Sequence, residues 1–154
     1  IHGTHLMKAT RGPITDGAVF HVDFESDPEA LVPELRLPDD FLSEGSAFCH
    51  GPGLTGATIV PKDSGLRALQ RLYATPIDDE RVAMHGMVNV GVQDDADASR
   101  GFAAELAKLV FEQWDNDIPI WEHKVYRNDP ALNETESAIA VFRRWFEQFY
   151  DRTA

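Results

Sequence analysis

The sequence predicts an α+β domain in which an antiparallel sheet is followed along the chain by two helices. Three observations support this: alternating apolar and polar residues across 17–92, helical periodicity over 94–118, and a second amphipathic segment at 134–151. Strands that precede helices are typical of a sheet with its helices on one face. The 154 residues suffice for one core, so we predict a single domain spanning 1–154.

The N-terminal third contains one clear strand signal. Residues 1–16 carry two glycines and a proline and show little periodicity, so we predict a loop or short turns there. The segment AVFHVDFES (18–26) alternates apolar with polar residues and predicts a strand. Residues 27–45 contain three prolines and many acids, which indicates a surface connection.

Three further segments are predicted to extend the sheet. Glycines interrupt residues 46–60, which suggests a bulge or a close backbone approach within the strand. Residues 65–78 and 81–92 alternate, and the residues IDDE (77–80) between them predict a hairpin turn. Together these segments predict an antiparallel meander.

The strongest helix signal covers 94–118. Asp95 or Asp97 can cap it, and Pro119 is predicted to stop it. Its predicted inward stripe comprises Phe102, Leu106, Leu109, Val110 and Gln113, and Asp117 continues that stripe. The inward residues of the second helix, 134–151, are predicted to be Ile139, Phe142, Trp145 or Phe146, and Phe149.

Charge and cysteine content exclude several classes of function. The net charge of −12 argues against nucleic acid and against an anionic membrane surface as partners, and leaves neutral apolar ligands. The longest apolar runs are too short to span a bilayer, and the N-terminal residues lack the apolar region of a secretory signal. A single cysteine, Cys49, excludes an internal disulfide or a chain-internal iron–sulfur cluster, and favours a reducing, cytoplasmic location.

The stretch DNDIPIWEHKVYRNDP (115–130) poses an electrostatic question. Carboxylates at the C-terminal end of a helix are disfavoured, because the last carbonyls already carry partial negative charge. We hypothesise that a metal ion compensates Asp117. The alternative is a solvated acid at a frayed helix end.

Three stretches resemble the C-terminal end of Rieske non-haem iron oxygenases. They are DNDIPIWEHKVYRNDPAL, the ending FRRWFEQFYD and LYATPIDDERVAMHGMVNV (72–90). The most similar group is the oxygenase component of 3-ketosteroid 9α-hydroxylase with its sterol-desaturase relatives, and the resemblance covers most of 45–151. It implies a curved antiparallel sheet packed on a long C-terminal helix, a partial helix-grip fold like that of START and Bet v 1 proteins.

The resemblance also implies a mononuclear Fe(II) held by two histidines and a carboxylate, which leaves positions open for O2 and substrate. Asp117, four residues before Trp121, matches the carboxylate. His2, in HGT, matches the second histidine, and the first would precede Ile1. We therefore expect an N-terminally truncated chain that is inactive alone. A [2Fe-2S] centre is expected in the full-length protein but is not ligated by this chain.

An apolar pocket is a further expectation, although its residues could equally form core. The candidates for substrate binding are Ala47, Cys49, Leu69, Tyr73, Met84, Val88 and Phe111. Residues 123–127 with Arg143 and Arg144 form a basic spot that could meet a carboxylate on a neighbouring subunit or redox partner, or remain solvated.

By resemblance, the chain is the catalytic portion of an oxygenase that hydroxylates or desaturates an apolar, steroid-like substrate with O2. Electrons would come from a ferredoxin or flavin reductase, and the full-length form would be a homotrimer. Two alternatives stay open: a non-catalytic helix-grip module that binds a hydrophobic ligand, and a regulatory or structural subunit.

Overall fold

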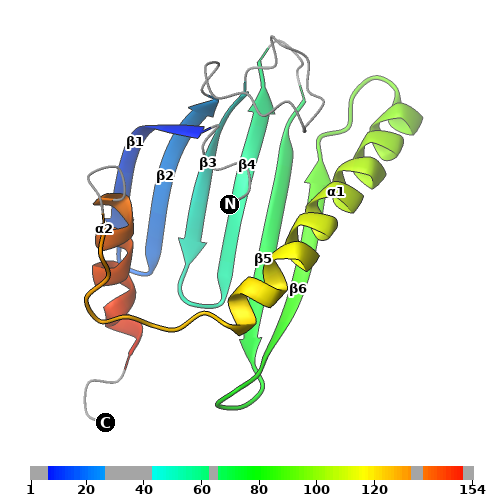
Figure 1. The fold of residues 1–154 in the computed structure, drawn as a ribbon. Helices are drawn as coiled ribbons and strands as arrows, with labels where there is room; N and C mark the ends of the chain where they lie inside the picture. Colours follow the sequence, from blue (N-terminus) through cyan, green and yellow to red (C-terminus); the bar gives the residue numbers. More distant parts are fainter. Residues whose placement is uncertain (1–6, 27–42, 63–65, 133–136, 151–154) are drawn as a thin grey trace.

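The structure is a computed structural model that describes residues 7–26, 43–62, 66–132 and 137–150. A six-stranded antiparallel sheet precedes two helices, so the α+β prediction is confirmed (Figure 1). The elements are β1 (Met7–Asp16), β2 (Val19–Ser26), β3 (Ser43–His50), β4 (Leu54–Pro61), β5 (Ala68–Pro76), β6 (Val82–Val90), α1 (Ala96–Glu122), α2 (Ser137–Phe146) and a 3-10 turn (Glu147–Phe149).

The strands pair in sequence order, and the register from β2 to β6 has no irregularity. Residues that pair across neighbouring strands therefore form straight rows, and every second row faces the same side of the sheet. One row on the helix-facing side consists of Phe20, Cys49, Thr55, Leu72 and Gly86. The next row on that side consists of Val22, Ala47, Ala57, Gln70 and Val88.

The first strand corrects a prediction. We expected a loop over 1–16, but residues 7–16 form β1 and pair with β2. The register shifts between Ala9 and Arg11 and again between Arg11 and Ile14. These irregularities, with a proline at an edge strand, remove the period-two signal by which a strand is recognised.

The segment 46–60 is also different from the prediction. It contributes to two strands, because Gly51 and Gly53 lie in a turn between β3 and β4 and do not form a bulge within one strand. Gly56 lies within β4 and has the expected close backbone approach, since a Cβ there would lie 2.6 Å from the Gln70 carbonyl oxygen. Gly51 has a positive φ of 64°, and its N–H donates to the Ala18 carbonyl at 2.7 Å. Part of the predicted connection, 43–45, belongs to β3, and the rest of it lies outside the described residues.

The first helix begins as predicted and ends later. The Asp95 carboxylate accepts from the N–H groups of Asp97 and Ala98, at 2.9 and 3.0 Å, so Asp95 is the cap. Pro119 does not stop α1, which continues to Glu122. Pro119 lacks only the N–H that would bond the carbonyl four residues earlier, and the surrounding turns continue.

The phase of α1 also differs from the predicted stripe. Phe102 and Leu109 are 41% and 56% exposed, whereas Ser99 and Val110 are buried. Trp114 lies against Gly86 of β6. The residues of α1 that pack on the sheet therefore form a stripe that is rotated about the helix axis from the predicted one. Leu106, Val110 and Asp117 lie within or next to both the predicted and the observed stripe.

The second helix is anchored through aromatic side chains. The ring of Phe20 lies 5.1 Å from that of Phe142 and 5.5 Å from that of Trp145. The indole N–H of Trp145, a residue only 7% exposed, donates to the Gly17 carbonyl at 2.9 Å. These contacts hold α2 against the turn between β1 and β2.

Gly86 provides a stability test of the α1–sheet contact. A Cβ at this position would lie 2.6 Å from the Phe111 ring and closer still to Trp114. Gly86→Ala should therefore lower the free energy of unfolding by about 1–3 kcal/mol. Gly101, within α1, has nothing near its Cβ position, so Gly101→Ala should instead stabilise by roughly 0.5–1 kcal/mol. Urea denaturation of both variants checks this; equal effects would show that Trp114 does not pack on Gly86.

The β5–β6 turn provides a pH test. The Arg81 side chain donates to Asp78 at 2.6 and 2.8 Å, and this lowers the pKa of the Asp78 carboxyl below its ordinary 3.8. A lowered pKa stabilises the fold at pH values above 3.8, and this contribution is lost as the pH falls through the folded-state value. Asp78→Ala should lower Tm at neutral pH more than Asp79→Ala does. The difference should shrink in acid; a pH-independent difference would contradict the ion pair as its cause.

Candidate functional site

The centre of the helix-facing side of the sheet carries only small side chains. Within the two rows described above, β3 and β4 contribute Ala47, Cys49, Thr55 and Ala57, which we call the floor. Larger residues border the floor on the neighbouring strands β2 and β5. The floor is therefore the part of this face where the side chains project least from the backbone of the sheet.

The two helices flank the floor. Phe20 and Gly86 belong to one row, and α2 contacts the first while α1 contacts the second, so both helices lie on the same face of the sheet. Figure 1 shows α1 along β5 and β6 and α2 beside β1. Within the described part of the chain, Val110 and Trp145 are the only apolar residues less than a tenth exposed. The layer between helices and sheet is therefore incompletely filled.

One flank of α1 is directed toward the floor. Leu106 shares a pocket with Ala57 and Ile59 of β4, which identifies the flank. Residues spaced three or four apart lie on one side of a helix. The residues that follow this spacing from Leu106 are Phe102, Leu109, Gln113, Asp117 and Ile120. The flank is apolar at several positions and exposed, with Ile120 at 55%, and it brings the half-buried Asp117 to the floor side.

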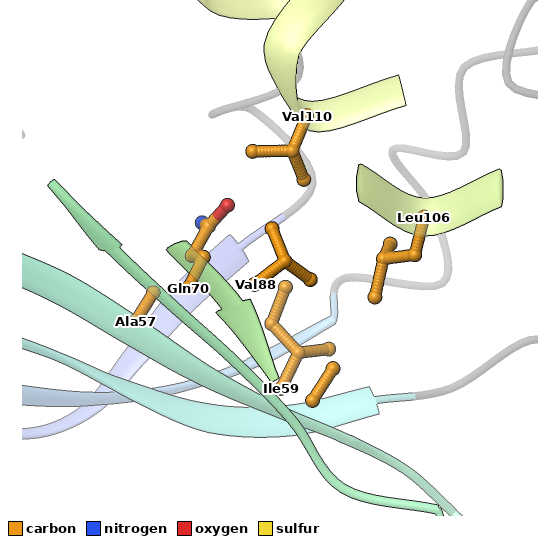
Figure 2. A pocket seen from close by; sticks show the side chains of 7 residues that line it. Ala57, Ile59, Gln70, Val88, Leu106 and Val110 are labelled. Atoms are coloured by element: carbon orange, nitrogen blue, oxygen red, sulfur yellow. The ribbon is translucent and has the colours of Figure 1, made fainter. Parts of the chain in front are cut away.

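A small pocket separates α1 from β4, β5 and β6 (Figure 2). Its lining consists of Ala57, Ile59, Ala68, Gln70, Val88, Leu106 and Val110. Gln70 is the one polar residue of this set, and its side chain rises from the sheet toward α1. No described residue forms a hydrogen bond with its amide. Gln70 can therefore donate to or accept from a ligand oxygen.

The candidate metal ligands are only partly described. Asp117 lies on the floor side of α1, whereas His2 is outside the described residues. Across 7–26, 43–62, 66–132 and 137–150, no three His, Cys, Asp or Glu side chains gather where they could hold a metal ion. These residues do not by themselves make an iron site, and Asp117 can supply one ligand at most.

The predicted pocket residues do not line one cavity. Cys49 belongs to the floor, where its thiol lies 3.5 Å from the Thr55 hydroxyl, and Val88 lines the small pocket. Met84 and Phe111 lie near the β6 edge, each 40% exposed.

Leu69 and Tyr73 lie on the other face of the sheet. Strand side chains alternate between faces, and Ala68 and Gln70 point toward α1, so Leu69 and Tyr73 point away from it. They cannot share a ligand with Cys49. Gln70 and Ala57 were not predicted to be pocket residues, because only the strand register shows that they meet beneath α1. The available signal for Gln70 was that the next residues on the same face of the predicted strand, Ala68 and Leu72, are apolar.

One residue of the predicted basic spot, Arg143, makes contacts within the chain. The Arg143 guanidinium lies 4.4 Å from the centre of the Tyr126 ring and donates to the Arg127 carbonyl. Arg144, the next residue on α2, is exposed. Arg143 therefore joins α2 to the segment that follows α1.

Among the described residues, neither helix combines the length and the apolar character that a bilayer crossing requires.

Comparison with known proteins identifies the family. The chain matches the 3-ketosteroid 9α-hydroxylase C-terminal domain over residues 2–150. It is 30% identical to a 3-ketosteroid-9-alpha-monooxygenase oxygenase component of Rhodococcus rhodochrous, over 97% of this chain and 36% of the relative. It is 48% identical over 42 residues to a cholesterol 7-desaturase of Drosophila melanogaster, which is 27% of this chain and 9% of that protein.

The chain thus spans about a third of the Rhodococcus relative and a smaller part of the Drosophila protein. The match covers nearly all of the 154 residues and confirms the resemblance noted in the three sequence stretches. This chain belongs to the 3-ketosteroid 9α-hydroxylase C-terminal domain family.

Proposed function

We propose that the chain is the catalytic portion of a Rieske-type oxygenase, an oxidoreductase that hydroxylates or desaturates a steroid-like substrate with O2 at a mononuclear Fe(II). The observation that carries this proposal is the floor of small side chains between the two helices, in a chain of this family. By helical spacing, Asp117 belongs to the same flank of α1 as Leu106, which lines the pocket with Ala57. A flat ring system fits above a floor of small side chains better than a branched chain does, because its whole face can contact the sheet.

The apolar surroundings support a hydrophobic substrate. The exposed flank of α1 presents Leu109 and Ile120, and the rim of the floor on β2 presents Phe20 and Val22. Covering such surfaces contributes roughly 25 cal/mol per Å² of apolar area removed from water. The names of the Rhodococcus and Drosophila relatives refer to a 3-ketosteroid and to cholesterol, both steroids.

Each polar group has a proposed role. Asp117 and His2 would be iron ligands, with a further histidine from outside this chain, and bound Fe(II) would supply O2 activation. Gln70 would orient the substrate by a hydrogen bond to one oxygen, because its amide has no partner among the described residues. The flank of α1 would exclude water from the bound face.

The wider assembly is part of the same proposal. Electrons would arrive from a ferredoxin or flavin reductase through a [2Fe-2S] centre carried by a longer polypeptide, in a cytoplasmic homotrimer. Family membership is the support for the electron supply and the assembly, and the single cysteine is the support for a reducing compartment.

A second candidate is a non-catalytic module that binds a hydrophobic ligand. The specific observation in its favour is that the floor of small side chains and the exposed apolar flank of α1 need no metal to bind an apolar molecule.

Iron binding separates the two candidates. We expect a polypeptide extended upstream to include the first histidine to bind one Fe(II) tightly under anaerobic conditions, and the chain 1–154 to bind it weakly. Asp117→Ala should abolish tight binding, because a facial triad loses one of its three ligands. Asp115→Ala, an exposed carboxylate on the same helix, is the control. Calorimetric titration measures both; binding that is absent or indifferent to Asp117 would favour the binding module.

Binding of the ligand on the floor can be tested by placing a larger side chain there. Ala57→Leu should weaken binding of a 3-ketosteroid by at least about tenfold, or ~1.4 kcal/mol, because the added atoms occupy the space of the ligand. Ala83→Leu makes the same change on the other face of the sheet and should leave affinity unchanged. Quenching of tryptophan fluorescence gives both affinities. If the two variants bind equally well, the ligand does not lie on the floor.

A further inference from the structure

The last turn of α1 has little support from its own helix. Pro119 has no N–H, so the Asp115 carbonyl lacks its partner four residues later. The last turn contains no basic residue to offset the partial negative charge of the helix end. Ile120 and Val125 are 55% and 70% exposed, so burial holds this region only weakly.

Contacts from outside the helix hold the region in place. His123 donates from Nδ1 to the Pro119 carbonyl at 2.7 Å, which closes the final turn. Arg143 of α2 then lies over the Tyr126 ring and donates to the Arg127 carbonyl. Tyr126 follows the end of α1 by only four residues, so a contact there restrains the helix end.

Arg143 itself stands on a firmly anchored helix. Two residues later, Trp145 donates to the Gly17 carbonyl, and Gln148 donates to the same carbonyl at 3.1 Å. The rings of Phe20 and Phe142 pack edge to face beneath them. A continuous series of contacts therefore runs from the β1–β2 turn through α2 and Arg143 to the end of α1.

We propose that Arg143 is a positioning residue, which fixes the C-terminal end of α1, and Asp117 with it, at a set distance from α2 across the floor. The effect on Asp117 rests on the proposed function; the restraint of the helix end does not. Arginine suits this role because its planar guanidinium can stack on a ring and donate to a carbonyl at once. Lysine keeps the charge but loses the planar, multiply donating group.

Hydrogen exchange tests the restraint directly on the chain 1–154. Arg143→Met should speed exchange of the amides in 118–127 by roughly tenfold, with the amides of β3–β5 unchanged. Arg143→Lys should recover part of the protection. The matched control is Arg144→Met, which alters the exposed neighbour on the same helix and should leave exchange unchanged. Equal exchange in the Arg143 and Arg144 variants would overturn the proposal.

Fe(II) affinity tests the effect on Asp117, in the extended polypeptide that carries the first histidine. Arg143→Met should weaken Fe(II) binding several-fold, Arg143→Lys less, and Arg144→Met not at all. Faster exchange with unchanged Fe(II) affinity would overturn the positioning of Asp117. If the unsubstituted protein binds no Fe(II), the proposed function fails, whereas the exchange result still decides whether Arg143 holds the helix end.

Discussion

The unbroken register from β2 to β6 is the constraint on which the rest of the structure depends. Because side chains alternate strictly along each strand, one register decides which residues face the helices on five strands at once. It aligns the small residues of β3 and β4 into the floor and places Leu69 and Tyr73 on the other side. A slip of one residue would exchange the two faces.

The helices are attached at the sides of the sheet and not at its centre. Trp114 packs on Gly86 at one side, and Trp145 hydrogen bonds to Gly17 at the other. Each contact pairs a large ring with a glycine, where the backbone can be approached closely. The centre of the sheet contributes little burial in the described part of the chain, so most of the stabilising contacts between helices and sheet lie at its two sides.

Much of the fold could be predicted from local patterns, since the β5–β6 hairpin, the Asp95 cap and the two helices each have a local signal. The strand β1 could not be predicted, because its irregular pairing with β2 is visible only in three dimensions. The helix end was placed too early, because a proline inside a helix removes one backbone hydrogen bond and can be tolerated when the turns around it continue. Asp117 lies within α1 and is half-buried, while its role as an iron ligand stays a prediction.

The candidate pocket was harder to predict than the fold. An apolar residue in a strand can serve a core or a cavity, and the choice depends on which strands lie opposite and on the phase of α1. Phe102 and Leu109 were predicted to be inward and are instead exposed on the flank of α1. The same apolar pattern that predicts packing can thus mark surface left open for a ligand.

Under the proposed function, the floor limits how the ligand specificity of this chain can change. Ala47 and Ala57 are almost as small as side chains can be, so nearly every substitution there adds atoms. Variation at these positions therefore acts in one direction: it can exclude larger molecules but can scarcely admit them. A broader range of molecules would have to arise by moving the helices apart, a change of backbone spacing that single substitutions in the sheet do not supply.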